Sequence, residues 1–131
     1  MPLCCFQKTS QTLRELRRKH EVVAWWASSI EAQSALKRLL EEKQISQTAY
    51  DEAVKRLEIQ SETWREILRT EKVRELAKTI IKNQNLRTLD ALQLAAALVW
   101  CFEKPTGRIF VCCDDKLSEA ARKIGFTGLP K

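Results

Sequence analysis

The sequence predicts an α/β fold, helix-rich, in which a mostly parallel sheet is flanked by helices. Two short runs, residues 22–26 (VVAWW) and 109–113 (IFVCC), are continuously apolar, which is typical of buried parallel strands. Between Pro2 and Pro105 the chain contains neither proline nor glycine, so helices are expected to dominate that stretch. Buried strands separated by helices indicate a parallel sheet with helices on both faces.

The first half of the chain is expected to be helical around one strand. A short basic helix at residues 10–19 precedes the strand at 22–26, and a second helix begins at Ser28. The apolar residues of this helix recur at the spacing of one helix face, and they are Ala32, Ala35, Leu36, Leu39 and Leu40. Residues 44–46 interrupt it. A long amphipathic helix is then expected at residues 48–68, with Ala49, Ala53, Leu57, Trp64 and Leu68 among its apolar positions.

The second half continues with helices, a turn and a strand. A helix is expected at residues 72–82, with Val73, Leu76, Ala77, Ile80 and Ile81 on one face. Thr88 is expected to cap the next helix, which carries the uncharged run 91–102. A turn at 105–107, the strand at 109–113, a helix from 115 to 124, and a turn with a last short strand at 125–130 follow.

Composition narrows the classes of function. With 131 residues, the chain is long enough for a single domain with a core, and its net charge of +6 favours an anionic partner such as nucleic acid. The lack of glycine before residue 107 excludes a P-loop or dinucleotide fingerprint there. The uncharged run is too short to span a bilayer and no signal peptide is visible, so a cytoplasmic protein without membrane association is expected.

Cysteine, histidine, tryptophan and arginine contribute weaker signals. Five cysteines without a C-x-x-C pattern favour reduced thiols over a disulfide framework. His20 is the only histidine and is expected at the surface, which excludes a multi-histidine metal site. The four tryptophans are expected to pack in the core, with base stacking as the alternative. A basic cluster is formed by Arg14, Arg17, Arg18 and Lys19. It is expected either to contact phosphates or to form a solvated helix face.

Three carboxylates fall at comparable places in the predicted fold. Glu31 lies in the first turn after the strand 22–26, Asp114 directly follows the strand 109–113, and Asp90 lies in the first turn of a helix. Ligands of open parallel sheets bind where strands end and helices begin. Carboxylates that share this edge would repel one another without a cation, and their oxygens suit Mg²⁺ or Mn²⁺. Together with the basic surface, this pattern predicts metal-assisted cleavage of a nucleic-acid backbone.

Each carboxylate also has a purely structural interpretation. Ser28 and Glu31 have the spacing of a capping box, Asp90 would complement the helix dipole, and Asp114 fits an N-cap. For each carboxylate considered alone, the structural interpretation is favoured. When the three carboxylates are considered together, their shared location in the predicted fold favours a metal site.

Three segments resemble motifs of one family. LRTLDALQLAAAL (residues 86–98) is similar to the third motif of the PIN domain, and of VapC-type toxin ribonucleases in particular. VCCDDKLSEAARKIGF (111–126) resembles the closing segment of that family, and SSIEAQSALKRL (28–39) resembles its second motif. The motifs occur in the order and spacing of the family, and the resemblance runs from about Leu3 to Pro130.

The resemblance implies a PIN-like three-layer sandwich, formed as one domain over residues 1–131. It implies an endoribonuclease dependent on Mg²⁺ or Mn²⁺, with Glu31, Asp90 and Asp114 as catalytic and metal-binding residues. Asp115 is a weaker candidate, because Asp114 keeps the spacing to Leu117. RNA, an antitoxin protein and a second copy of the chain are the implied partners. Beside Asp90, Arg87 and Thr88 are placed to contact RNA.

Two departures from the family pattern qualify the expected activity. The family opens with a strand that carries an Asp, and this chain begins after that segment, so a truncated fold lacking the first strand and with impaired activity is expected. Cys112 stands where the family often has a hydroxyl residue, and a thiol is a poorer partner for a hard cation. The main alternative is a non-catalytic relic that binds RNA or an antitoxin. A helical DNA-binding regulator is a weaker alternative, because the two strands count against it.

Overall fold

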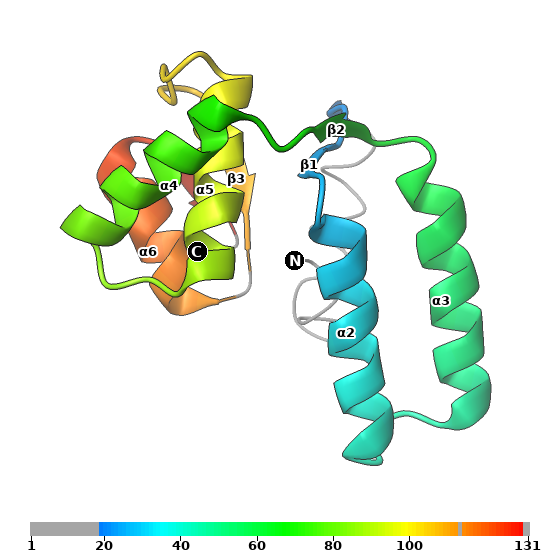
Figure 1. The fold of residues 1–131 in the computed structure, drawn as a ribbon. Helices are drawn as coiled ribbons and strands as arrows, with labels where there is room; N and C mark the ends of the chain where they lie inside the picture. The colour runs from blue at the N-terminus through cyan, green and yellow to red at the C-terminus, as the bar shows by residue number, and fades with distance from the viewer. Residues whose placement is uncertain (1–18, 113, 130–131) are drawn as a thin grey trace. The chain divides into compact units, whose positions relative to one another are not determined.

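The computed structural model describes residues 19–112 and 114–129, which form a mostly helical α/β structure (Figure 1). The elements of this part are β1 (Val23–Trp25), α2 (Ser28–Glu41), α3 (Gln47–Ser61), β2 (Arg65–Ile67), α4 (Glu71–Asn83), α5 (Thr88–Trp100), β3 (Ile109–Val111), α6 (Asp115–Ile124) and β4 (Thr127–Leu129). The predicted helix-rich α/β class is therefore confirmed. Almost all of the helix predicted at residues 10–19 lies outside the described residues. The chain divides between Arg65 and Glu66 into two compact units.

The first unit is built on a hairpin of two helices, α2 and α3, which run side by side in opposite directions (Figure 1). The chain turns between them at residues 42–46, where Lys43 has a φ of 60°. Ser46 then caps α3, because its hydroxyl accepts a hydrogen bond from the Ala49 N–H at 3.1 Å. The break predicted at residues 44–46 is thus confirmed.

The core of this hairpin follows from the apolar spacing along α2. Ala32, Leu36 and Leu57 are buried at its centre. Partly buried apolar side chains surround them, and these are Leu39, Ile45, Tyr50, Ala53, Val54 and Trp64. The i, i+4 pattern of α2 therefore packs against α3, as the sequence predicts.

The helix predicted at residues 48–68 is wrong in its last part, because α3 ends at Ser61 and residues 65–67 form strand β2. The hydroxyls of Ser61 and Thr63 donate to the carbonyl oxygens of Glu58 and Gln60 at 3.0 and 2.7 Å. The Arg65 N–H donates to the Val22 carbonyl at 3.1 Å, which aligns β2 with β1. This contact with a distant part of the sequence overrides the helical periodicity, and Leu68 is 59% exposed instead of packed.

The second unit contains a βαβ segment in which α6 connects the parallel strands β3 and β4. Phe110 lies opposite Gly128 in the register of the pair, and the Cys112 N–H extends the ladder by donating to the Leu129 carbonyl at 2.9 Å. The last short strand predicted from the sequence is present and pairs in parallel with β3, but the single parallel sheet predicted from the two apolar runs is wrong, because β1 pairs with β2 in a separate two-stranded sheet. This segment delivers the residues after β3 to the start of α6.

Helices α4 and α5 pack on this βαβ segment through small and branched apolar side chains. The buried residues of the unit include Val73, Ala77, Ile80, Ala91, Leu94, Ala95, Ala96, Leu98, Cys101, Phe110, Cys112, Leu117, Ser118, Ala120, Ala121 and Phe126. Many of them are alanines, which let helix backbones approach closely. Ile81 was predicted on the apolar face of α4, but it is 45% exposed. None of the helices in residues 19–112 and 114–129 has the length and apolarity needed to cross a membrane.

Candidate functional site

Asp114 lies in the turn between β3 and α6 and is the N-cap of that helix. Its carboxylate Oδ1 accepts a hydrogen bond from the Leu117 N–H at 3.1 Å. Its own N–H donates to the buried Cys112 Sγ at 3.2 Å, and the Ser118 hydroxyl donates to the Cys112 carbonyl at 3.3 Å. The capping interpretation of Asp114 is confirmed, and these bonds fix the carboxylate at the end of the strand.

Asp90 is the third residue of α5, and its side chain is 22% exposed. The prediction that Thr88 caps this helix is wrong. The N-cap residue is Arg87, because its backbone is extended and its carbonyl accepts the Ala91 N–H at 2.9 Å, and no side-chain capping hydrogen bond is made. The Arg87 Nε lies 3.9 Å from Asp90 Oδ2, but the Arg87 side chain is 87% exposed, so the ion pair is weak.

Electrostatic interactions link Asp90 to Asp114. Burial raises the pKa of Asp90, the negative charge of Asp114 raises it further, and Arg87 lowers it. Burial also raises the pKa of the Cys112 thiol. The charge of Asp114 therefore acts on Asp90, and the Cys112 thiol stays protonated at neutral pH.

Glu31 belongs to the first unit, where it lies in the first turn of α2 and its Oε1 is buried. The capping box considered for Ser28 and Glu31 is not formed. Ala27 is the N-cap residue, and the Ser28 hydroxyl instead accepts the Trp25 N–H at 3.1 Å. The N–H of Glu31 donates to the Ala27 carbonyl at 3.0 Å, as in an ordinary first turn. The placement of Glu31 directly after β1 agrees with the sequence prediction.

The described carboxylates do not form a complete metal site by themselves. No group of three or more His, Cys, Asp or Glu side chains among the described residues is arranged to hold a metal ion. However, Mg²⁺ is commonly bound by only one or two carboxylates, while waters and substrate phosphates complete its coordination. Asp90 and Asp114 supply two carboxylates, and their repulsion is what a cation would relieve. Two carboxylates are as many as a well-hydrated Mg²⁺ or Mn²⁺ ion commonly takes from a protein.

The other residues singled out in the sequence have mixed outcomes. Trp25 is buried, as predicted for the core, whereas Trp26 is 39% exposed, which contradicts that prediction. His20 is exposed, as predicted. Cys101 and Cys112 are buried free thiols. The remaining members of the cysteine and arginine groups lie outside the described residues, and they are Cys4, Cys5, Cys113, Arg14, Arg17 and Arg18.

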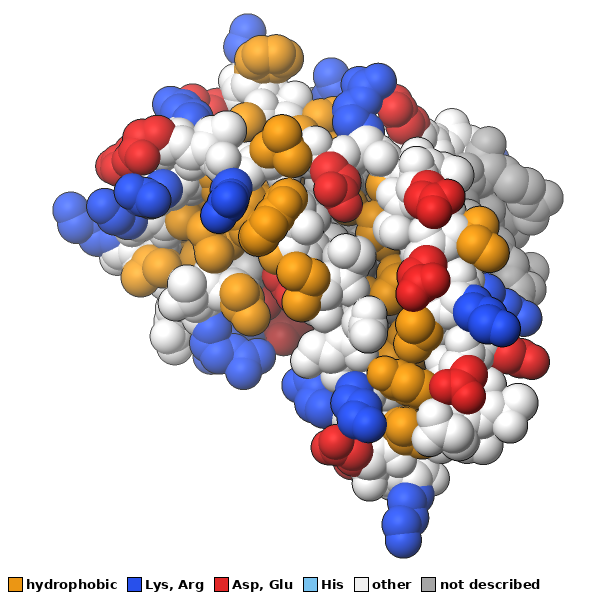
Figure 2. Space-filling view, turned by 45° about the vertical axis from the view of Figure 1, so that its right-hand side comes forward, with side chains coloured by type: hydrophobic (Ala, Val, Ile, Leu, Met, Phe, Trp, Pro, Cys, Tyr) orange, Lys and Arg blue, Asp and Glu red, His pale blue; other side chains and the backbone are white. Residues whose placement is uncertain are grey.

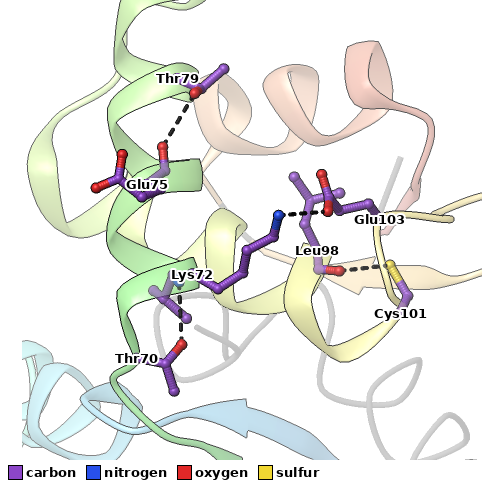
Figure 3. A network of polar contacts seen from close by, with 8 residues as sticks. Thr70, Lys72, Glu75, Thr79, Leu98, Cys101 and Glu103 are labelled. Carbon is purple, nitrogen blue, oxygen red and sulfur yellow. Dashed lines mark hydrogen bonds and ion pairs between the residues drawn. The ribbon is translucent and has the colours of Figure 1, made fainter.

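The second unit also carries a shallow groove that the sequence did not indicate. Its volume is about 300 Å³, and its lining residues are Leu76, Thr79, Ile80, Asn83, Gln84, Leu98, Glu103, Pro105 and Ile124. Figure 2 shows hydrophobic side chains gathered over α4 and α5, with charged side chains at their edges. An ion pair of 3.1 Å between Lys72 and Glu103 joins the start of α4 to the residues after α5 (Figure 3). Asp90 and Asp114 do not line this groove, so it is separate from the carboxylate pair.

No family model, no curated protein and no solved structure matches this chain. The features of the chain that bear on function are the carboxylates Asp90 and Asp114, the net positive charge and the three motif-like segments. Of these, the carboxylate pair is the feature that the structure describes in most detail.

Proposed function

We propose that the chain is a divalent-cation-dependent endoribonuclease of the PIN type, with a PIN-like three-layer sandwich as its fold. The support for this function is that Asp90 and Asp114 lie at the starts of two helices and that the negative charge of Asp114 raises the pKa of Asp90. A half-buried carboxylate that makes no capping hydrogen bond is retained at some cost in desolvation, which a bound cation would offset. The net charge of +6 adds a general attraction to RNA.

The proposed roles follow from these placements. Asp90 and Asp114 hold Mg²⁺ or Mn²⁺, and the resemblance adds Glu31 as a third acidic residue. The bound ion supplies a Lewis acid and a source of activated water. The hydrogen bond from the Leu117 N–H orients Asp114. Arg87, which is 87% exposed, contacts RNA phosphates together with Thr88.

The partners and location implied by the resemblance belong to the same proposal. An antitoxin protein would inhibit the enzyme, a second copy would form a homodimer, and the protein would act in the cytoplasm. Cys112 would reduce the affinity of the site for the harder Mg²⁺, because a buried, protonated thiol is a weak partner for that ion or its water.

The test is cleavage of single-stranded RNA in Mn²⁺ or Mg²⁺ by the wild-type chain, Asp90→Asn and Asp114→Asn. Asparagine keeps the size of both residues and the capping ability of Asp114, but it removes the charge. We expect each substitution to reduce the cleavage rate by roughly 100-fold, the scale for removing one group that stabilises charge in a transition state. The matched control is Asp115→Asn, an exposed carboxylate in the first turn of α6, which should cleave like the wild type. Equal cleavage by all four proteins would refute the catalytic assignment.

A second candidate function is non-catalytic binding of RNA or an antitoxin by a PIN-like relic. It is favoured by one observation, namely that the described residues contain no group of three metal-binding side chains. Such a protein would bind RNA in a salt-dependent manner but would not cleave it when Mn²⁺ is added. RNA binding without any cleavage by the wild-type chain would therefore select this candidate.

A further inference from the structure

The loop at residues 101–108, between α5 and β3, combines an exposed aromatic ring with basic side chains. Phe102 is 85% exposed, more than any other large hydrophobic residue in the described part of the chain. Lys104 and Arg108 are also exposed. The loop contains Glu103, Lys104 and Arg108, and Lys72 of α4 is paired with Glu103. These three cations and one anion give a net charge of +2. The loop is thus both apolar and positively charged at the surface.

The backbone that carries Phe102 is held in place by several bonds. The Phe102 N–H donates to the Val99 carbonyl at 3.1 Å, and the Glu103 N–H donates to the Leu98 carbonyl at 2.8 Å. The ion pair between Glu103 and Lys72 adds a side-chain link to α4 (Figure 3). Phe102 and Glu103 both adopt left-handed backbone angles, with φ of 54° and 60°. The loop therefore presents the ring from a fixed backbone instead of burying it.

A second aromatic residue positions one of the cations. The Arg108 guanidinium carbon lies 5.0 Å from the centre of the Trp100 ring. A guanidinium stacked on a ring face can still donate hydrogen bonds from its edges. The Glu103 carboxylate is paired with Lys72 at 3.1 Å, so it opposes an incoming anion less than an isolated carboxylate would.

We propose that residues 101–108 form an auxiliary site for single-stranded RNA, in which Phe102 stacks on a base and Lys104 and Arg108 contact the flanking phosphates. Exposed aromatic rings beside cations are the groups by which proteins hold single strands without sequence preference. The proposal rests on the proposed function for RNA as the ligand. Asp90 lies at the start of α5 and the loop follows its end, roughly 20 Å away for a helix of this length. The site therefore affects RNA binding and not the chemical step.

The experiment measures binding of fluorescein-labelled single-stranded oligouridylate to the whole chain by anisotropy at low salt. Phe102→Ala should weaken binding about tenfold, within the range expected for the loss of one stacked base. Phe102→Tyr should restore binding, because tyrosine keeps a ring that stacks. The matched control is Ile59→Ala, which removes another exposed apolar side chain, 66% exposed in α3, and should bind like the wild type. A 4-thiouridine probe should cross-link to residue 102.

The outcomes separate this inference from the proposed function. If the wild-type chain binds no RNA, both the proposed function and the auxiliary site are overturned. If the wild type binds RNA but Phe102→Ala and Ile59→Ala bind it equally well, only the auxiliary site is overturned, and Phe102 is left for contact with a protein. If Phe102→Ala loses binding to single strands and Phe102→Tyr regains it, the auxiliary site is supported.

Discussion

The starts of α5 and α6 carry the same kind of residue but use it differently. In α6, Asp114 is exposed and its carboxylate caps the helix through the Leu117 N–H. In α5, Asp90 is mostly buried, and no side chain caps the helix. The charge of Asp114 stabilises α6 directly through the capping hydrogen bond. The charge of Asp90 has no such bond, and burial and the charge of Asp114 both raise the pKa of Asp90.

This difference shows how a structural carboxylate can be separated from a functional candidate. An aspartate in the first turn is explained by the local backbone when it accepts a capping hydrogen bond, as Asp114 does. Among the described residues, Asp90 has a weak contact with Arg87 at 3.9 Å and lies at the favourable end of the helix dipole, and the like charge of Asp114 opposes its ionisation. Burial and the like charge of Asp114 both oppose the ionisation of Asp90, while Asp114 itself also serves as a helix cap.

The largest effect is expected when Mn²⁺ is added, and it tests whether a cation relieves the repulsion between Asp90 and Asp114. In the wild-type chain, Mn²⁺ at ten times its dissociation constant should stabilise the fold by about 1.4 kcal/mol, which thermal unfolding detects as a higher midpoint. In Asp90→Asn the same addition should have a much smaller effect, because one of the two charged ligands is gone. If Mn²⁺ leaves the wild-type midpoint unchanged and Asp90→Asn raises it, the carboxylates merely repel each other and no cation binds.

A smaller effect tests the capping side of the comparison. Asp114→Ala should lower the free energy of unfolding by about 1 kcal/mol, because it removes the acceptor for the Leu117 N–H. Asp114→Asn should cost less, since asparagine also caps helices. Asp90→Ala should not show this capping loss, because Asp90 makes no such bond. Urea unfolding of the three variants measures the difference, and an equal loss in Asp114→Ala and Asp90→Ala would remove the distinction between the two helix starts.

The sequence predicted α6 well because its signals are local. Asp114 and Gly125 mark its two ends, and the glycine adopts a φ of 124° at the C-cap. The end of α3 could not be predicted in the same way. It depends on the hydrogen bond from Arg65 to Val22, which lies far away in the sequence and has no local pattern. The predicted start of α5 differs from the observed start by one residue, because Arg87 and not Thr88 is the N-cap residue.

The candidate site was predicted in part for the same reason. The positions of Asp90 and Asp114 in first turns follow from local sequence, and the topology of a parallel strand pair explains why an acidic residue follows β3. The exposure of Phe102 was not predictable, because it ends an uncharged run that otherwise builds the core. Only the left-handed turn after α5, which non-glycine residues adopt here, carries its ring out of that core.

A third prediction uses the raised pKa of Asp90. The folded chain holds the Asp90 proton more tightly than the unfolded chain does, so the contribution of this group to stability is greatest below the ordinary value of 3.8 and is lost as the pH rises through the raised pKa. Asp90→Asn should therefore gain stability relative to the wild type as the pH rises from below 3.8 through the raised pKa of Asp90. Urea unfolding across that range measures the change. Asp114→Asn should shift the transition to lower pH, and an unchanged profile in both variants would show that the two carboxylates do not interact.

The smallest expected effect concerns Arg87, the cation beside Asp90. Arg87→Ala should change the free energy of unfolding by less than about 0.5 kcal/mol, because an exposed ion pair of 3.9 Å contributes little. Its effect on RNA should be clearer. If Arg87 contacts one phosphate, the slope of log binding constant against log salt concentration should fall by about 0.7 for a single strand.

A matched arginine decides whether that change in slope belongs to the start of α5 or to the positive charge of the whole chain. Arg74 is also exposed and paired, at 3.5 Å from Glu71, but it lies on α4. Arg74→Ala removes the same charge and a comparable ion pair, so its salt slope should stay close to that of the wild type. If both variants reduce the slope equally, RNA is attracted by the net charge of +6 and not by a site beside Asp90. If only Arg87→Ala reduces it, the phosphate lies where the proposed cation and Asp90 would act on it.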